Sequence, residues 1–138
     1  MLWVLVTIVL PLTLPVLAML FLEPFAPFSG TAKWILPIKD GQLCWGAIAM
    51  AFSGMYEVLF PSYSATVDAM FRGAVVISLA VVVFCSVLFA AVGAVAPTPV
   101  PAPPGRPWHA HYVTLIRSAV TTSVAAAIYT AVHFNANP

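Results

Sequence analysis

Glu57 is the residue with the clearest chemical potential in this chain, because it falls inside a long apolar stretch, residues 43–60. Ionisable side chains within membrane spans are energetically costly and are often functional. If the neighbouring apolar segments run antiparallel, basic and acidic residues reach the same end as Glu57. The sequence therefore predicts an intramembrane polar cluster made of Glu57, Arg72, His133 and Asp68. Within it we expect Glu57 to pair with Arg72, with His133 nearby.

Such a cluster has two possible roles. It can be a structural clamp that fastens the helix ends, with the carboxylate reaching toward the lipid headgroups. It can also be a proton or cation site, because a carboxylate held at this depth binds positive charge strongly.

A second pair is predicted at the opposite end of the bundle. Glu23 closes the first apolar segment and Arg117 opens the last one, so the two lie near the same depth. Arg117 can instead extend its guanidinium to lipid phosphates.

Other reactive residue types do not form a recognisable catalytic or metal pattern. His109 and His111 make an H-x-H, but a metal site needs three or four converging ligands. We interpret Cys44 and Cys85 as small apolar residues at different depths. The sequence contains no G-x-S-x-G, H-E-x-x-H, Walker A or C-x-x-C motif. We therefore expect no catalytic residue, no metal, no cofactor and no enzymatic activity.

Four apolar segments must position these residues. They cover residues 2–22, 43–60, 73–95 and 112–134, and the third carries no charged side chain. A helix over residues 73–95 reaches roughly 34 Å, enough to cross a hydrocarbon core of about 30 Å. The predicted fold class is all-α: a single transmembrane domain over residues 1–138, built as an antiparallel bundle of four transmembrane helices.

The sequence also predicts the form of the connections and the faces through which the helices pack. Residues 96–107 are half proline and predict an extended connector. Pro11 and Pro15 predict a kink in the first segment. We expect Asp40 to cap the second helix and Lys39 to reach water. Small residues recur at helical spacing and predict close helix contacts: Ala47, Ala51 and Gly54; Ser118, Thr122 and Ala126; Ala119, Ser123 and Ala127.

Composition supports the membrane assignment. Hydrophobic residues make up 62% of the chain and charged residues 7%, whereas soluble domains carry about 25% charged residues. So few charges cannot cover a soluble surface. The net charge of +1 gives no reason to expect nucleic acid as a partner.

The distribution of basic residues predicts the orientation. Lys33, Lys39, Arg106 and Arg117 fall on one side of a four-span bundle, and Arg72 falls on the other. Lys and Arg are enriched on the cytoplasmic side. Both termini are therefore predicted on the non-cytoplasmic side of a bacterial-type inner (plasma) membrane.

The expected function follows from this architecture. The small-residue faces indicate binding within the lipid bilayer, either to another membrane protein or to a second copy of the chain. We expect a non-enzymatic accessory or interaction subunit; one form would be an immunity-type protein against a membrane-targeting toxin, by analogy of size and architecture. The alternative is a small transporter or an oligomeric, holin-like pore with Glu57 on its path.

Overall fold

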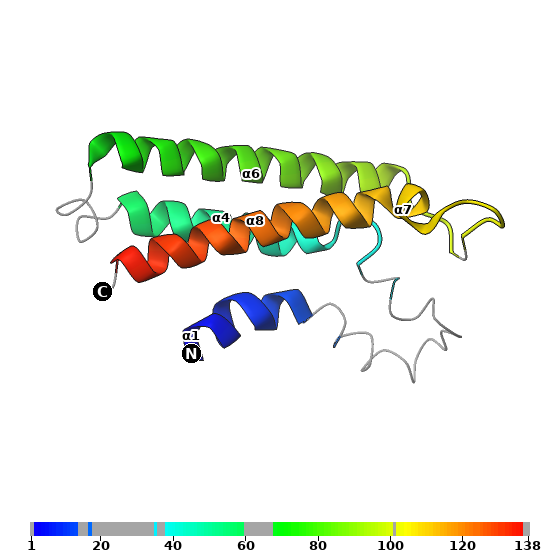
Figure 1. Ribbon diagram of the computed structural model, residues 1–138, viewed down its shortest axis with the longest axis horizontal. Helices are drawn as coiled ribbons and strands as arrows, with labels where there is room; N and C mark the ends of the chain where they lie inside the picture. Colours follow the sequence, from blue (N-terminus) through cyan, green and yellow to red (C-terminus); the bar gives the residue numbers. More distant parts are fainter. Residues whose placement is uncertain are drawn as a thin grey trace.

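The computed structural model describes residues 2–13, 17, 35, 38–59, 68–100 and 102–136, and this part of the chain is all helical, without strands. Its elements, in order, are α1 (Leu2–Val4), the π-helix η1 (Leu5–Val9), α4 (Leu43–Leu59), α6 (Ala69–Val95), α7 (Trp108–His111) and α8 (Val113–Ala136). Helices α4, α6 and α8 run side by side along the long axis, and the N-terminal helical stretch lies next to them (Figure 1).

Helix α6 is the longest element, with 27 residues. It begins four residues before the predicted segment, because the turn that contains Arg72 is also helical. It ends at Val95, where Ala96 leaves the helical region at φ −126° and ψ 71°. Ala96 precedes Pro97, and a residue before proline is disfavoured in the α conformation. The proline-rich segment therefore terminates the helix sharply.

Helix α4 packs against both α6 and α8, and its small residues make this possible. Ala47, Ala51 and Gly54, the predicted small-residue face, are all buried. A methyl group on Gly54 would come within 3.1 Å of Leu79 on α6 and 3.4 Å of Tyr129 on α8. Small side chains let helix backbones approach closely, so α4 can lie between two neighbours.

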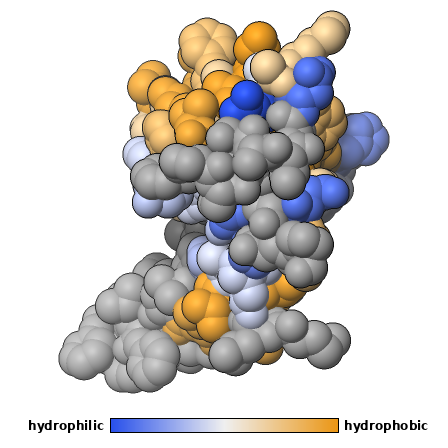
Figure 2. Space-filling view, turned by 90° about the vertical axis from the view of Figure 1, so that its left-hand side faces the viewer, coloured by the Kyte–Doolittle hydropathy of each residue, from blue (hydrophilic) through white to orange (hydrophobic). Residues whose placement is uncertain are grey.

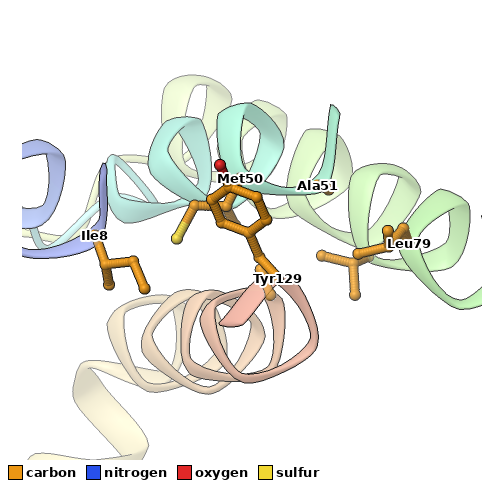
Figure 3. Packing of buried hydrophobic residues seen from close by; sticks show 8 residues of the cluster. Ile8, Met50, Ala51, Leu79 and Tyr129 are labelled. Carbon is orange, nitrogen blue, oxygen red and sulfur yellow. The ribbon is translucent and has the colours of Figure 1, made fainter. Parts of the chain in front are cut away.

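The hydrophobic core draws on every long helix and on the N-terminal stretch. Ile8, Met50, Leu79 and Tyr129 come from four different helical segments and pack in one cluster (Figure 3). The N-terminal stretch is helical from Leu2 to Thr13, but its second turn is a π-helix just before Pro11. Proline crowds the preceding turn, and a π-helix is one way to absorb that crowding. The remainder of the predicted 2–22 span, including Pro15, lies outside the described residues apart from Leu17.

The outer faces of the helices are apolar. In the most apolar 18-residue window of α6, only 17% of the residues are buried. A core helix of a soluble protein would be mostly buried, whereas a helix in lipid exposes its apolar side chains to the hydrocarbon. Helices α6 and α8 are long and apolar enough to cross a membrane; α4, with 17 residues, is shorter. The described part of the chain thus contains two candidate membrane-spanning helices.

Candidate functional site

A polar cluster lies at the end of the bundle where α4 and α8 finish. Glu57 is in the last turn of α4 and His133 is near the end of α8. The His133 Nδ1 atom lies 3.1 Å from Oε1 and 3.3 Å from Oε2 of Glu57. Their side chains are 20% and 22% exposed, respectively. Carboxylate oxygens accept hydrogen bonds, so Nδ1 is the donor in this contact.

Two aromatic residues complete this cluster. The Tyr129 hydroxyl, one turn before His133 on α8, donates to Glu57 Oε1 at 3.4 Å. The Trp3 ring stacks on the His133 ring, with 3.6 Å between centroids and planes 6° apart, and it also contacts Tyr129. The imidazole is therefore held between an indole ring and a carboxylate. These two contacts fix the orientation of the imidazole ring.

A hollow opens beside the carboxylate. It has a volume of about 500 Å³ and is lined by Phe52, Ser53, Tyr56, Glu57 and Tyr129. One acidic group among aromatic rings, next to a histidine, is an arrangement that can hold a proton or an organic cation. Figure 2 faces this end of the molecule and shows hydrophilic surface lying directly beside hydrophobic surface.

Arg72 does not join Glu57. In the described part of the chain, the ion pair of Glu57 is with His133, and Arg72 instead lies beside Val58 and Leu59. Successive helical residues are rotated by about 100°, so the side of α4 that meets Arg72 is turned away from Glu57. Glu57 and Arg72 lie at the same end of the bundle, but their side chains are on different sides of α4. The expected Glu57–Arg72 pair is therefore not formed.

Asp68 is also separate from the cluster. It precedes α6, is exposed, and makes no side-chain bond to the first turn of that helix. The predicted partner at the other end, Glu23, lies outside the described residues, so the Glu23–Arg117 pair does too. Arg117 itself is exposed on α8.

A second polar cluster, not predicted from the sequence, ties the proline-rich connector to the turn at residues 38–42. Lys39 Nζ contacts the Asp40 carboxylate and donates to the Thr98 carbonyl at 2.6 Å. Asp40 Oδ1 accepts the Thr98 backbone N–H at 2.8 Å. His111 Nε2 donates to the Pro99 carbonyl at 2.8 Å. We call Lys39, Asp40, Thr98, Pro99 and His111 the connector anchor.

The connector anchor corrects two expectations. Asp40 was expected to cap α4, but that helix begins at Leu43 and the Asp40 carboxylate binds Thr98 instead. Lys39 was expected to reach water, yet it is 7% exposed. A buried ammonium group needs partners, and the Asp40 carboxylate and the Thr98 carbonyl supply them. Gly41 allows this turn: its φ is +79°, and a side chain there would meet the Phe89 carbonyl.

The remaining candidate ligands do not converge. His109 is exposed, and Cys44 and Cys85 are free thiols. Across the residues that the structure describes, no three histidine, cysteine or acidic side chains come together in a way that could hold a metal ion.

Comparison with known proteins gave no match: no family model fits the chain, and searches of characterised proteins and of solved structures found no significant similarity.

Proposed function

We propose that this chain is an integral membrane protein of four crossing helices that serves as a non-enzymatic interaction subunit. The apolar outer faces of α6 and α8 support the membrane placement. Helices α4, α6 and α8 and the N-terminal stretch already share one core of buried residues. Any partner must therefore bind on an outer face, either as another membrane protein or as a second copy.

The observation that carries this proposal is a row of small residues on the outside of α8. Ser123, Ala127 and Ala131 follow one another at four-residue spacing, and all three are exposed. Helices associate in lipid where small side chains permit close backbone approach. In the predicted stripe of Ser118, Thr122 and Ala126, by contrast, the first two residues are buried and Ala126 is partly buried. Thr122 donates to the Leu43 carbonyl of α4 at 3.0 Å. One small-residue face of α8 thus packs inside the bundle, and the other is exposed with respect to the residues that the structure describes.

Cross-linking in native membranes tests the proposal. We expect the wild-type chain to form a discrete cross-linked species, either a homodimer or a defined complex. Ala127→Leu should remove it, because leucine keeps the helices apart. Ala80→Leu, the same change at an exposed position of α6, should leave it intact. Equal cross-linking of all three proteins, or none in the wild type, would contradict an interaction role for this face. An immunity-type role would additionally require that the partner be a membrane-targeting toxin.

The second candidate function is transport of protons or small cations through Glu57. The hollow of about 500 Å³ beside Glu57 favours it, because it exposes a carboxylate at one end of the bundle. A path would also need polar groups at other depths. Of those described, Ser118 and Thr122 are buried and donate to backbone carbonyls. Proton flux into liposomes that is abolished by Glu57→Gln would favour transport over interaction.

A further inference from the structure

A groove separate from the Glu57 cluster lies between the end of α4 and the start of α6. It has a volume of about 330 Å³ and is lined by Val58 and Leu59 of α4 and by Arg72, Gly73, Val76 and Ile77 of α6. Leu59 and Ile77 are 68% and 67% exposed, so the groove opens outward, away from the core. Its walls are apolar except for one guanidinium group.

One donor of the Arg72 guanidinium, Nε, has no partner among the described residues. This atom is buried. Asp68, one turn earlier, bonds to Arg72 only through the backbone, where the Arg72 N–H donates to the Asp68 carbonyl at 3.1 Å. A buried donor without an acceptor is unfavourable, so an oxygen acceptor beside Nε would stabilise this site.

The local helix geometry adds to the positive potential. Arg72 lies in the first turn of α6, where backbone N–H groups point out of the helix and the helix dipole is positive. Asp68 at the cap position makes no side-chain bond to these groups. An anion near Arg72 would therefore be attracted both by the guanidinium and by the start of the helix.

The depth of Arg72 matches the position of lipid phosphates. The uncharged part of α6 begins at Gly73, directly after Arg72, and runs to Val95. These residues reach roughly 34 Å, close to the thickness of the hydrocarbon core, so Arg72 falls at the boundary with the headgroups. Val76 and Ile77 continue the groove along the helix toward the membrane interior.

We propose that this groove is a binding site for an anionic phospholipid, with the phosphodiester on Arg72 and an acyl chain along Val76 and Ile77. A guanidinium can hold two phosphate oxygens at once, which an ammonium group cannot match. The phosphate of a zwitterionic lipid is neutralised by its own ammonium group, so a lipid without one binds more tightly. The inference rests on the proposed membrane placement of α6.

Native mass spectrometry of the purified full chain tests the site, with phosphatidylglycerol and phosphatidylcholine as probes. The wild type should retain phosphatidylglycerol preferentially. Arg72→Gln should weaken that binding by on the order of tenfold, the loss of one charge-assisted contact. Arg106→Gln removes the same charge from the exposed connector and should change nothing. Arg72→Lys should also bind phosphatidylglycerol weakly. Because this variant keeps the positive charge, it serves as the test if Arg72→Gln does not fold.

A groove-filling variant tests the acyl-chain part independently. A side chain at Gly73 would point into open space, so Gly73→Leu should fold and should occupy the groove. Gly73→Leu should weaken phosphatidylglycerol binding even though Arg72 is still present in this variant. Inorganic phosphate should not compete. Unchanged phosphatidylglycerol binding in Arg72→Gln, or full competition by inorganic phosphate, would overturn the lipid site. Unchanged binding in Gly73→Leu would overturn the placement of the acyl chain in the groove.

Alkaline carbonate extraction separates failure of this site from failure of the proposed function. If the chain stays in the membrane pellet while Arg72→Gln binds lipid like the wild type, only the lipid site is wrong. If carbonate releases the chain, the membrane placement is wrong, and the lipid site is wrong with it.

Discussion

Two side chains of α8 bind the Glu57 carboxylate, and Trp3 of the N-terminal stretch covers one of them. His133 and Tyr129 direct N–H and O–H groups at the carboxylate, and Trp3 covers the imidazole. Hydrogen bonds to charged groups are stronger than neutral ones, and partial burial strengthens them further. The cluster therefore fastens the ends of α4 and α8 to each other and to the N-terminal stretch.

The double variant of Glu57 and His133 should lose less unfolding free energy than the sum of the losses in the two single variants. We expect Glu57→Gln and His133→Gln each to lower the unfolding free energy, with a coupling energy of about 1 kcal/mol in the double variant. Unfolding by dodecyl sulfate, followed by circular dichroism, measures the cycle. His109→Gln, a change at an exposed histidine, is the control. Strict additivity would show that the Glu57–His133 contact does not contribute to stability.

Two glycines of α6 should respond oppositely to the same substitution. A methyl group on Gly93 would overlap the backbone carbonyl of Asp40, whereas one on Gly73 would meet nothing. Gly93→Ala must displace the turn at residues 38–42 and should lose about 1–3 kcal/mol of stability. Gly73→Ala should gain about 0.5–1 kcal/mol, because alanine favours the helix. The same denaturation assay measures both, and equal effects would contradict the close approach at Gly93.

Sequence reasoning could bring some residues of the site together but not all. Antiparallel threading places Glu57 and His133 at one end, because depth along a helix follows from residue number alone. Arg72 has the right depth too, yet its direction depends on the rotation of α6 about its axis, which a nearly uniform apolar sequence does not specify. Tyr129 could have been found, since it lies one turn from His133 on the same face. The stacking of Trp3 depends on how the N-terminal stretch docks.

At the scale of elements, α4 organises the bundle because it has a close neighbour on two sides. Its small-residue face was predictable from the spacing of Ala47, Ala51 and Gly54. Helix boundaries beside prolines were predictable as well. Helix α6 ends before Pro97, and α7 begins directly after Pro107. The connector anchor was not predictable, because nothing in the sequence near Lys39 indicates a contact with Thr98, 59 residues away.

The connector anchor should limit the motion of the proline-rich segment. Asp40→Ala removes the acceptor of the Thr98 N–H and a partner of Lys39. We expect the Thr98 amide to exchange its hydrogen about tenfold faster, the effect of losing roughly 1.4 kcal/mol of protection. Hydrogen–deuterium exchange of the peptide that contains Thr98 measures this.

Asp68→Ala is the matched control for that experiment, because Asp68 is an exposed aspartate that makes no capping bond. It should leave exchange at Thr98 unchanged. Equal exchange in wild type and Asp40→Ala would mean that the connector is held by other contacts, such as His111 with Pro99.

At the scale of the whole molecule, the distribution of apolar surface is the dominant feature. Phe84, Val92 and Val95 on α6 are among many large apolar side chains that face outward. In water such a surface would drive aggregation, whereas in lipid it is the solvated face. Polar side chains gather at the two ends, in the Glu57 cluster and in the connector anchor. This division fits a bundle whose middle lies in hydrocarbon and whose ends lie at the headgroups.

The number of crossings decides on which side the termini lie. The described N-terminal helix, from Leu2 to Thr13, reaches only about 18 Å, short of a core of about 30 Å. If the segment up to residue 22 completes the crossing, four spans place both termini on one side. The excess of Lys and Arg around the first and third connections then predicts that this side is non-cytoplasmic. Three spans would instead leave the termini on opposite sides.

Paired reporter fusions at the two ends distinguish these arrangements. Alkaline phosphatase, active outside the cytoplasm, should give high activity when fused after Pro138 and when fused before Met1. A cytoplasm-active fluorescent protein should be dark at both positions. Replacing Lys39 and Arg106 with glutamine would weaken the charge bias and should give a mixed orientation, since these are two of the four basic residues that set it. Opposite signals at the two ends would show that the N-terminal segment does not cross, and cytoplasmic signals at both would reverse the topology while keeping four spans.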